Sequence, residues 1–173
     1  MEAQGASRYY RRVKRSTTYL LLSIALLLAA CKNSQPAQIG TEAPTFTIND
    51  GHKTVNLKEL RGKPVVLNFW ATWCAPCIQE VPSIVAMQKQ LGDKVTVLAV
   101  SIDVDDDAYT KFTSTRMPGI LTVRDGDQKS SSLYGTYGWP ETYIIDRNGI
   151  IRRKFIGAVD WANPEVVDYL KSL

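Results

Sequence analysis

Two cysteines lie three positions apart in the stretch Phe69-Trp70-Ala71-Thr72-Trp73-Cys74-Ala75-Pro76-Cys77. Its first two residues complete the run 65–70, which is nearly all apolar and β-prone and predicts a strand buried on both faces. After the pair, apolar side chains recur at helical spacing between residues 78 and 91. The cysteines therefore lie where a buried strand gives way to a helix.

A cysteine at the start of a helix has a distinct chemistry. The unpaired N–H groups and the helix dipole favour a thiolate there, so we expect Cys74 to have a depressed pKa and to be the attacking nucleophile. Cys77, one turn later, would resolve the resulting mixed disulfide by forming a reversible disulfide with Cys74. This spacing predicts a redox-active dithiol that works without a metal or a separate cofactor.

Three alternative interpretations of the pair compete with this one. A zinc site needs about four ligands, but apart from Cys31 the soft donors are only Cys74, Cys77 and the single His52. A purely structural disulfide would close so short a loop that it gains little stability. A peroxidatic cysteine would want a threonine three residues upstream, where Ala71 stands. The redox-active dithiol is favoured over all three.

The elements around the pair predict an α/β domain with a mixed sheet. A second apolar run at 95–100 follows the helix, and strand, helix and strand in this order form a βαβ unit. Turn, cap and periodicity signals add further elements. They are strands at 45–48 and 53–56 around Asn49-Asp50-Gly51, a helix beginning near Asp105, a strand at 121–123, strands at 142–145 and 150–156 around Asn148-Gly149, and a last helix capped by Asn163.

The first thirty residues differ from the rest of the chain in charge. The net charge of +4, from 21 basic and 17 acidic residues, lies entirely in residues 1–30, because residues 31–173 are balanced. The balanced domain gives no support for nucleic-acid binding. With 45% hydrophobic and 22% charged residues, the composition is that of a globular protein with one core. The basic cluster runs into an apolar segment too short to span a bilayer, which indicates an export signal.

The end of this segment, Leu28-Ala29-Ala30-Cys31, resembles the lipobox of bacterial lipoproteins, in which the signal is cut before a cysteine that then carries lipid. We therefore predict a signal peptide at 1–30, a flexible tether at 31–40 and one domain at 41–173. The protein would be exported and lipid-anchored to a bacterial membrane, facing the periplasm or the cell exterior. An ordinary cleaved signal and a short uncleaved anchor are the alternatives.

Two more motifs accompany the cysteines. Glu80-Val81-Pro82 follows them, and Gly138-Trp139-Pro140-Glu141-Thr142 precedes a strand. Together these motifs resemble the TlpA/ResA-type thioredoxin-like thiol-disulfide oxidoreductases, and residues 137–146 are also similar to the thioredoxin-like reductant of cytochrome c maturation. The resemblance covers about residues 41–160. It implies a thioredoxin-like fold, with a central mixed β-sheet flanked by helices and extended by the N-terminal β-hairpin.

The resemblance also implies roles for individual residues. Pro140 matches the cis-proline that faces the cysteine pair, and the backbone of Trp139 would pair with a bound peptide. Glu80 matches an acid close to the disulfide that relays a proton, with a solvated helix position as its alternative. Trp73, Trp139 and Thr142 are expected to contact substrate, and ordinary core packing is the alternative for the two tryptophans.

The function implied is the reduction of protein disulfides, with apocytochrome c as one substrate and a membrane electron donor protein upstream. Asn68 stands where cytoplasmic thioredoxins carry an aspartate, which supports Glu80 as the acid. A thiol-dependent peroxidase and a non-enzymatic tethered binding module are the alternatives. The acidic run 103–107 is interpreted as a helix cap, because Ala108 and Ser114 stand where a calcium-binding EF-hand needs glycine and glutamate.

Overall fold

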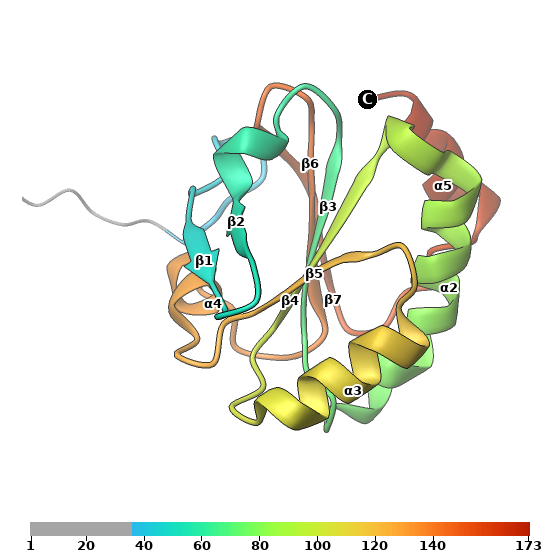
Figure 1. Ribbon diagram of the computed structural model, residues 1–173. Coiled ribbons are helices and arrows are strands. Elements are labelled where there is room, and N and C mark those ends of the chain that lie inside the picture. Colours follow the sequence, from blue (N-terminus) through green and yellow to red (C-terminus); the bar gives the residue numbers. More distant parts are fainter. Residues whose placement is uncertain (1–35) are drawn as a thin grey trace, which may run out of the picture. The chain divides into compact units, whose positions relative to one another are not determined.

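Figure 1 shows the computed structural model of the protein, which describes residues 36–173. The signal peptide, the lipobox and Cys31 predicted above lie outside the described residues. The elements, in chain order, are β1 (Thr47–Asn49), β2 (Thr54–Asn56), the 3-10 helix η1 (Leu57–Leu60), β3 (Val65–Trp70), α2 (Ala75–Leu91), the 3-10 helix η2 (Gly92–Lys94), β4 (Thr96–Ser101), α3 (Asp106–Arg116), β5 (Leu121–Arg124), α4 (Lys129–Tyr134), β6 (Glu141–Ile145), β7 (Ile151–Ile156) and α5 (Pro164–Lys171).

The centre of the domain is a five-stranded mixed sheet in the order β5-β4-β3-β6-β7. Strand β3 runs parallel to β4 and antiparallel to β6, while β5 and β7 form the edges. Helices α2, α3 and α5 lie on one side of the sheet, and α4 and the β1–β2 hairpin lie on the other (Figure 1). This is the predicted thioredoxin-like arrangement with its N-terminal hairpin.

The apolar run of β3 is explained by these two layers. All six of its residues are buried, because alternate side chains point to opposite faces and both faces are covered. Val66 packs in the cluster beneath α2 and α5, whereas Leu67 and Phe69 pack against α4 and the hairpin. The prediction of a strand buried on both faces is confirmed.

The strand register brings the important loops to one end of the sheet. Strands β3 and β4 both end there, and β6 begins there, since Phe69 pairs with Glu141 and Trp70 pairs with Ser101. The segment between β3 and α2, which contains Cys74, therefore lies beside the start of β6, which Pro140 immediately precedes.

Packing begins a few residues before the predicted domain boundary at 41. Ala37 belongs to the core cluster on the hairpin side, and Gly40 N–H donates to the carbonyl of Ile151 at the start of β7. Among residues 36–173, no helix is long and apolar enough to cross a membrane.

Candidate functional site

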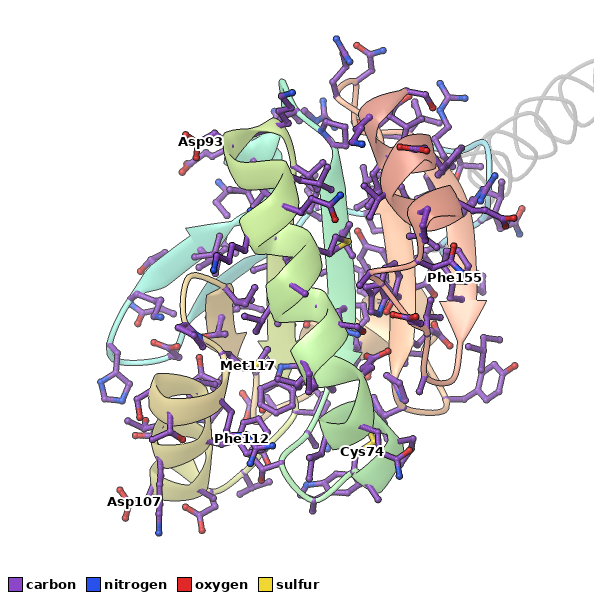
Figure 2. The ribbon with its side chains drawn as sticks, turned by 90° about the vertical axis from the view of Figure 1, so that its right-hand side faces the viewer. Cys74, Asp93, Asp107, Phe112, Met117 and Phe155 are labelled. Carbon is purple, nitrogen blue, oxygen red and sulfur yellow. A yellow bond between two sulfur atoms is a disulfide. The ribbon has the colours of Figure 1, made fainter. Side chains whose placement is uncertain are left out.

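The two cysteines form a disulfide at the N-terminus of α2. Their Cα atoms are 5.2 Å apart, and Cys74 is the N-cap residue, whose sulfur accepts a hydrogen bond from Cys77 N–H at 3.3 Å. Pro76 lies in the first turn, where the missing N–H removes no helical hydrogen bond. Figure 2 shows Cys74 at one end of α2 and Asp93 just beyond the other end. Both sulfurs are thus held where the helix exposes its free N–H groups.

Pro140 follows a cis peptide bond from Trp139, at the start of β6. Trp139 packs against the cluster that contains Cys74 and Cys77, and its ring meets that of Trp73 edge to face at a centroid distance of 5.8 Å. Trp73 is 62% exposed. The two tryptophans therefore form one aromatic pair beside the disulfide, with Trp73 on its open side.

Glu80 lies one turn after Cys77 on α2, so the two side chains share a helix face. Its carboxylate is 3% exposed and accepts three hydrogen bonds, from Asn68 Nδ2 at 2.8 Å, Val159 N–H at 3.1 Å and Trp161 Nε1 at 3.1 Å. Burial raises the pKa of Glu80, and the hydrogen bonds from Trp161, Val159 and Asn68 lower it less than burial raises it. Glu80 is therefore not a solvated helix residue.

Asn68 links Glu80 to the strand that follows Pro140. Its side-chain amide donates to Glu80 and also to Thr142 Oγ1 at 2.9 Å. Thr142 is buried, so its side chain supports this network instead of facing a substrate. The three residues form a chain of contacts across α2, β3 and β6.

A second buried carboxylate, Glu141, lies on the other face of the sheet. It is fully buried and contacts Lys154 Nζ at 3.0 Å, Thr136 Oγ1 at 2.9 Å and the Tyr143 hydroxyl at 2.5 Å. Partial burial lowers the pKa of Lys154, but its contacts with Tyr143 and Glu141 outweigh this and hold the pKa above its usual value. The residue next to Pro140 thus carries a buried ion pair that the motif did not reveal.

The polar residues considered for metal binding have other partners. Asp105 caps α3 through Ala108 N–H, and Asp106 pairs with both Arg124 and His52. Among the described residues, no group of three or more His, Cys, Asp or Glu side chains could hold a metal ion. The acidic run therefore serves α3 and its neighbours, as the helix-cap interpretation expected.

A thioredoxin-like domain that places a disulfide at the first turn of a helix, beside a cis-proline, defines the class of thioredoxin-fold dithiol proteins. The chain belongs to the AhpC/TSA family, whose model matches residues 39–154. It is 33% identical over 143 residues to the thiol-disulfide oxidoreductase ResA of Bacillus thuringiensis strain Al Hakam, with 82% of each chain covered. It is 35% identical over 149 residues to the thiol:disulfide interchange protein DsbE of Pseudomonas fluorescens biotype C, again with 82% of each covered.

A solved structure extends the comparison. The exposed lipoprotein thioredoxin of Streptococcus pneumoniae strain TIGR4 matches with a TM-score of 0.64 and 25% identity, over 75% of this chain and all of that one. The family and the relatives agree with the fold. The protein is accordingly a thiol-disulfide oxidoreductase of the ResA and DsbE type.

The resemblance implied that Glu80 and Pro140 lie close to Cys74 and Cys77, and in the structure the disulfide and Glu80 lie in the first turns of α2, at the end of the sheet where β6 begins after Pro140. Sequence reasoning missed Trp161, which donates to Glu80 across 81 residues of sequence. No local pattern signals such a contact. Asn68 did carry a signal, because it is the one polar side chain in the buried strand β3.

Proposed function

We propose that the protein is a membrane-tethered, extracytoplasmic enzyme that reduces protein disulfides through Cys74 and Cys77. The observation that carries the proposal is the disulfide between these residues at the first turn of α2. The free N–H groups at this position favour a thiolate on Cys74, and Cys77 lies within bonding distance to resolve it.

The reaction begins from the dithiol. The Cys74 thiolate attacks one sulfur of a substrate disulfide, so the substrate bond breaks, a mixed disulfide forms and the second substrate sulfur leaves as a thiolate that takes up a proton. The Cys77 thiolate then attacks the Cys74 sulfur and releases the first substrate sulfur. Two electrons pass to the substrate, and Cys74 and Cys77 end as a disulfide that a membrane electron donor protein reduces again.

The loop before β6 supports binding of an extended substrate segment. Within the described residues, neither the N–H nor the C=O of Trp139 has a hydrogen-bond partner. An extended substrate peptide beside Trp139 would form hydrogen bonds with both groups, as an added strand does. This pairing would hold the cysteine of the substrate against Cys74. The exposed ring of Trp73 would cover apolar side chains next to that cysteine.

Glu80 is suited to handle the proton of the resolving step. It shares a face of α2 with Cys77, and burial raises its pKa, so it holds a proton at a higher pH than an exposed glutamate does. A cavity of about 280 Å³ lined by Glu80, Ser83 and Val159 provides space for water beside the carboxylate. We propose that Glu80 accepts the proton of Cys77 and returns it to solvent through this cavity.

Export and anchoring rest on the sequence around Cys31. The basic and apolar segments ahead of it are typical of an export signal, and lipid on Cys31 would hold the domain at a membrane. The pneumococcal relative described as an exposed lipoprotein supports this location. The similarity of residues 137–146 to the reductant of cytochrome c maturation supports apocytochrome c as one substrate.

The test is a trapping experiment with full-length Cys77→Ser expressed in the native cell envelope. Without the resolving thiol, mixed disulfides should accumulate on Cys74, and mass spectrometry after non-reducing purification identifies the bound proteins. The double variant Cys74→Ser, Cys77→Ser is the control and should trap nothing. Recovery of no trapped protein from Cys77→Ser would exclude protein disulfides as the substrate.

Direction and anchoring are tested separately. A reduction potential close to that of strong periplasmic oxidants would exclude the reductase direction. For the anchor, Cys31→Ser should move the protein from the membrane fraction to the soluble fraction of the envelope while leaving the dithiol reactive. Unchanged membrane association of Cys31→Ser would contradict the lipid anchor.

A further inference from the structure

Asp103 has a buried carboxylate that the chemistry described so far does not use. It follows β4 and is only 2% exposed. Thr72 N–H lies 3.0 and 3.2 Å from its two oxygens, Thr72 Oγ1 donates at 2.7 Å, and Ser101 Oγ donates at 2.5 Å. The donors are neutral, and within residues 36–173 no basic side chain forms an ion pair with this carboxylate. Such an arrangement holds a buried negative charge by hydrogen bonds alone.

Thr72 belongs to the short segment that connects β3 to Cys74. Besides the apolar packing of Ala71, few other hydrogen bonds hold this segment: Ile102 N–H donates to the Trp70 carbonyl at 3.0 Å, and Cys74 N–H donates to the Ala71 carbonyl at 3.2 Å. The contacts of Asp103 fix the backbone two residues before Cys74. They therefore help to determine the position of Cys74 at the first turn of α2.

We propose that Asp103 is a positioning residue of the redox centre, which clamps Thr72 so that Cys74 caps α2 and whose negative charge disfavours the Cys74 thiolate. The proposal rests on the redox role proposed for Cys74. Two opposing electrostatic effects would then act on Cys74, because the N-terminus of α2 favours its thiolate and the charge of Asp103 disfavours it. A charge that disfavours the thiolate favours the neutral disulfide, and so makes the dithiol a stronger reductant.

The size of the charge effect follows from the short connection between the two residues. Thr72, to which the carboxylate is bonded, precedes Cys74 by two residues, and two like charges about 10 Å apart at an effective dielectric constant of about 20 repel each other by about 1.7 kcal/mol, which corresponds to a rise of about one pH unit in a thiol pKa. The other ionisable groups around the centre are Glu80 from α2, Tyr109 from α3 and Arg124 from β5, whose side chain is bonded to Asp106 and to the Val104 carbonyl. These groups are the same in every variant below.

The charge is tested with full-length Asp103→Asn, which keeps the size of the side chain and an acceptor for Thr72. The matched control is Asp107→Asn, which removes the same charge from the exposed first turn of α3, labelled in Figure 2. We expect the Cys74 pKa of reduced Asp103→Asn, measured from the pH dependence of alkylation by iodoacetamide, to fall by about one pH unit. Asp107→Asn should match the wild type.

The equilibrium with dithiothreitol gives a second readout with a characteristic pH dependence. Asp103→Asn should shift toward the dithiol by up to about tenfold above pH 9 and hardly at pH 6, because only the thiolate feels the charge. A purely structural role would lower the unfolding midpoint in urea without moving the Cys74 pKa. An unchanged Cys74 pKa in folded Asp103→Asn would overturn the electrostatic role.

The clamp is tested with Thr72→Val, which removes one donor to Asp103 but keeps the charge. The rate constant for reduction of oxidised glutathione by the dithiol should fall about tenfold at an unchanged Cys74 pKa, and Thr72→Ser should restore it. A wild-type rate in Thr72→Val would overturn the positioning role, and this holds even if Asp103→Asn does not fold. None of these measurements uses a protein substrate, so they stay informative if trapping by Cys77→Ser fails.

Discussion

Replacing Glu80 by alanine should lower the free energy of unfolding by about 2 to 4 kcal/mol. Within the described residues, the change removes the only acceptor of Trp161 Nε1, which is buried, and of Val159 N–H, which is partly buried, and an orphaned buried donor costs about 1 to 3 kcal/mol. Asn68 keeps Thr142 as a partner and adds little to the cost. The cavity beside Glu80 admits water that can satisfy one donor, which places the total below the simple sum.

Urea denaturation of the oxidised protein, followed by tryptophan fluorescence and far-ultraviolet circular dichroism, measures this difference. Gln79→Ala is the matched control, because Gln79 precedes Glu80 on α2 and lies nearer the helix surface. We expect the control to change the free energy of unfolding by less than about 0.5 kcal/mol. A loss below about 1 kcal/mol for Glu80→Ala would show that the donors around Glu80 find other partners, and it would refute the account of the network given above.

Three further predictions concern buried charges and pH. Lys154→Met should destabilise the protein by about 3 to 5 kcal/mol in urea, because Glu141 then remains buried without its cation, and adding Glu141→Gln should recover most of this loss. Because burial raises the pKa of Glu80 above that of an exposed glutamate, the wild type should lose stability relative to Glu80→Gln as pH rises above about 4. The loss should be about 1.4 kcal/mol for each pH unit by which the pKa of Glu80 in the folded protein exceeds its pKa in the unfolded chain, and a gain of stability would contradict the direction. Burial raises the pKa of Tyr109 to about 12, so ultraviolet titration should show a step there that Tyr109→Phe removes, and stability should fall above about pH 10.

The part of the fold that follows from local pattern was predictable from the sequence. The apolar run of β3 and the helical spacing after Cys77 predicted a buried strand and a helix, and both lie where expected. The Asn148-Gly149 signal predicted the hairpin between β6 and β7. The expectation that Pro140 faces the cysteine pair came from the resemblance, and the register between β3 and β6 was not predicted, because pattern alone does not align distant strands.

Helix α4 was missed because its local signals are poor. It contains three consecutive serines, and its N-cap residue, Gln128, has a left-handed backbone conformation with no capping hydrogen bond from its side chain. The buried side chain of Asp125 accepts hydrogen bonds from both Ser130 N–H and Ser130 Oγ and so satisfies the start of the helix from outside. Tertiary contacts of this kind override propensity.

Contacts between side chains far apart in the sequence could not be predicted from local pattern either. For example, His52 Nε2 lies 2.9 Å from a carboxylate oxygen of Asp106, 54 residues away. Thr72 and Asp103 are separated by a whole βα unit, and neither residue type identifies the other. Hydrophobic periodicity reports which face of an element is buried, but it does not report which polar groups meet inside.

The burial of Ala37 in the core sets a limit on where the enzyme can work. With lipid on Cys31, as proposed above, only five residues would lie between the lipid-bearing cysteine and Ala37, the first buried side chain of the described residues, and the stretch from Cys31 to Ala37 can span at most about 20 Å. A tether of that length would confine the domain to a thin layer above the bilayer. A large folded protein would have difficulty entering that layer with its disulfide turned toward Cys74, whereas a chain emerging unfolded from the membrane would meet it directly.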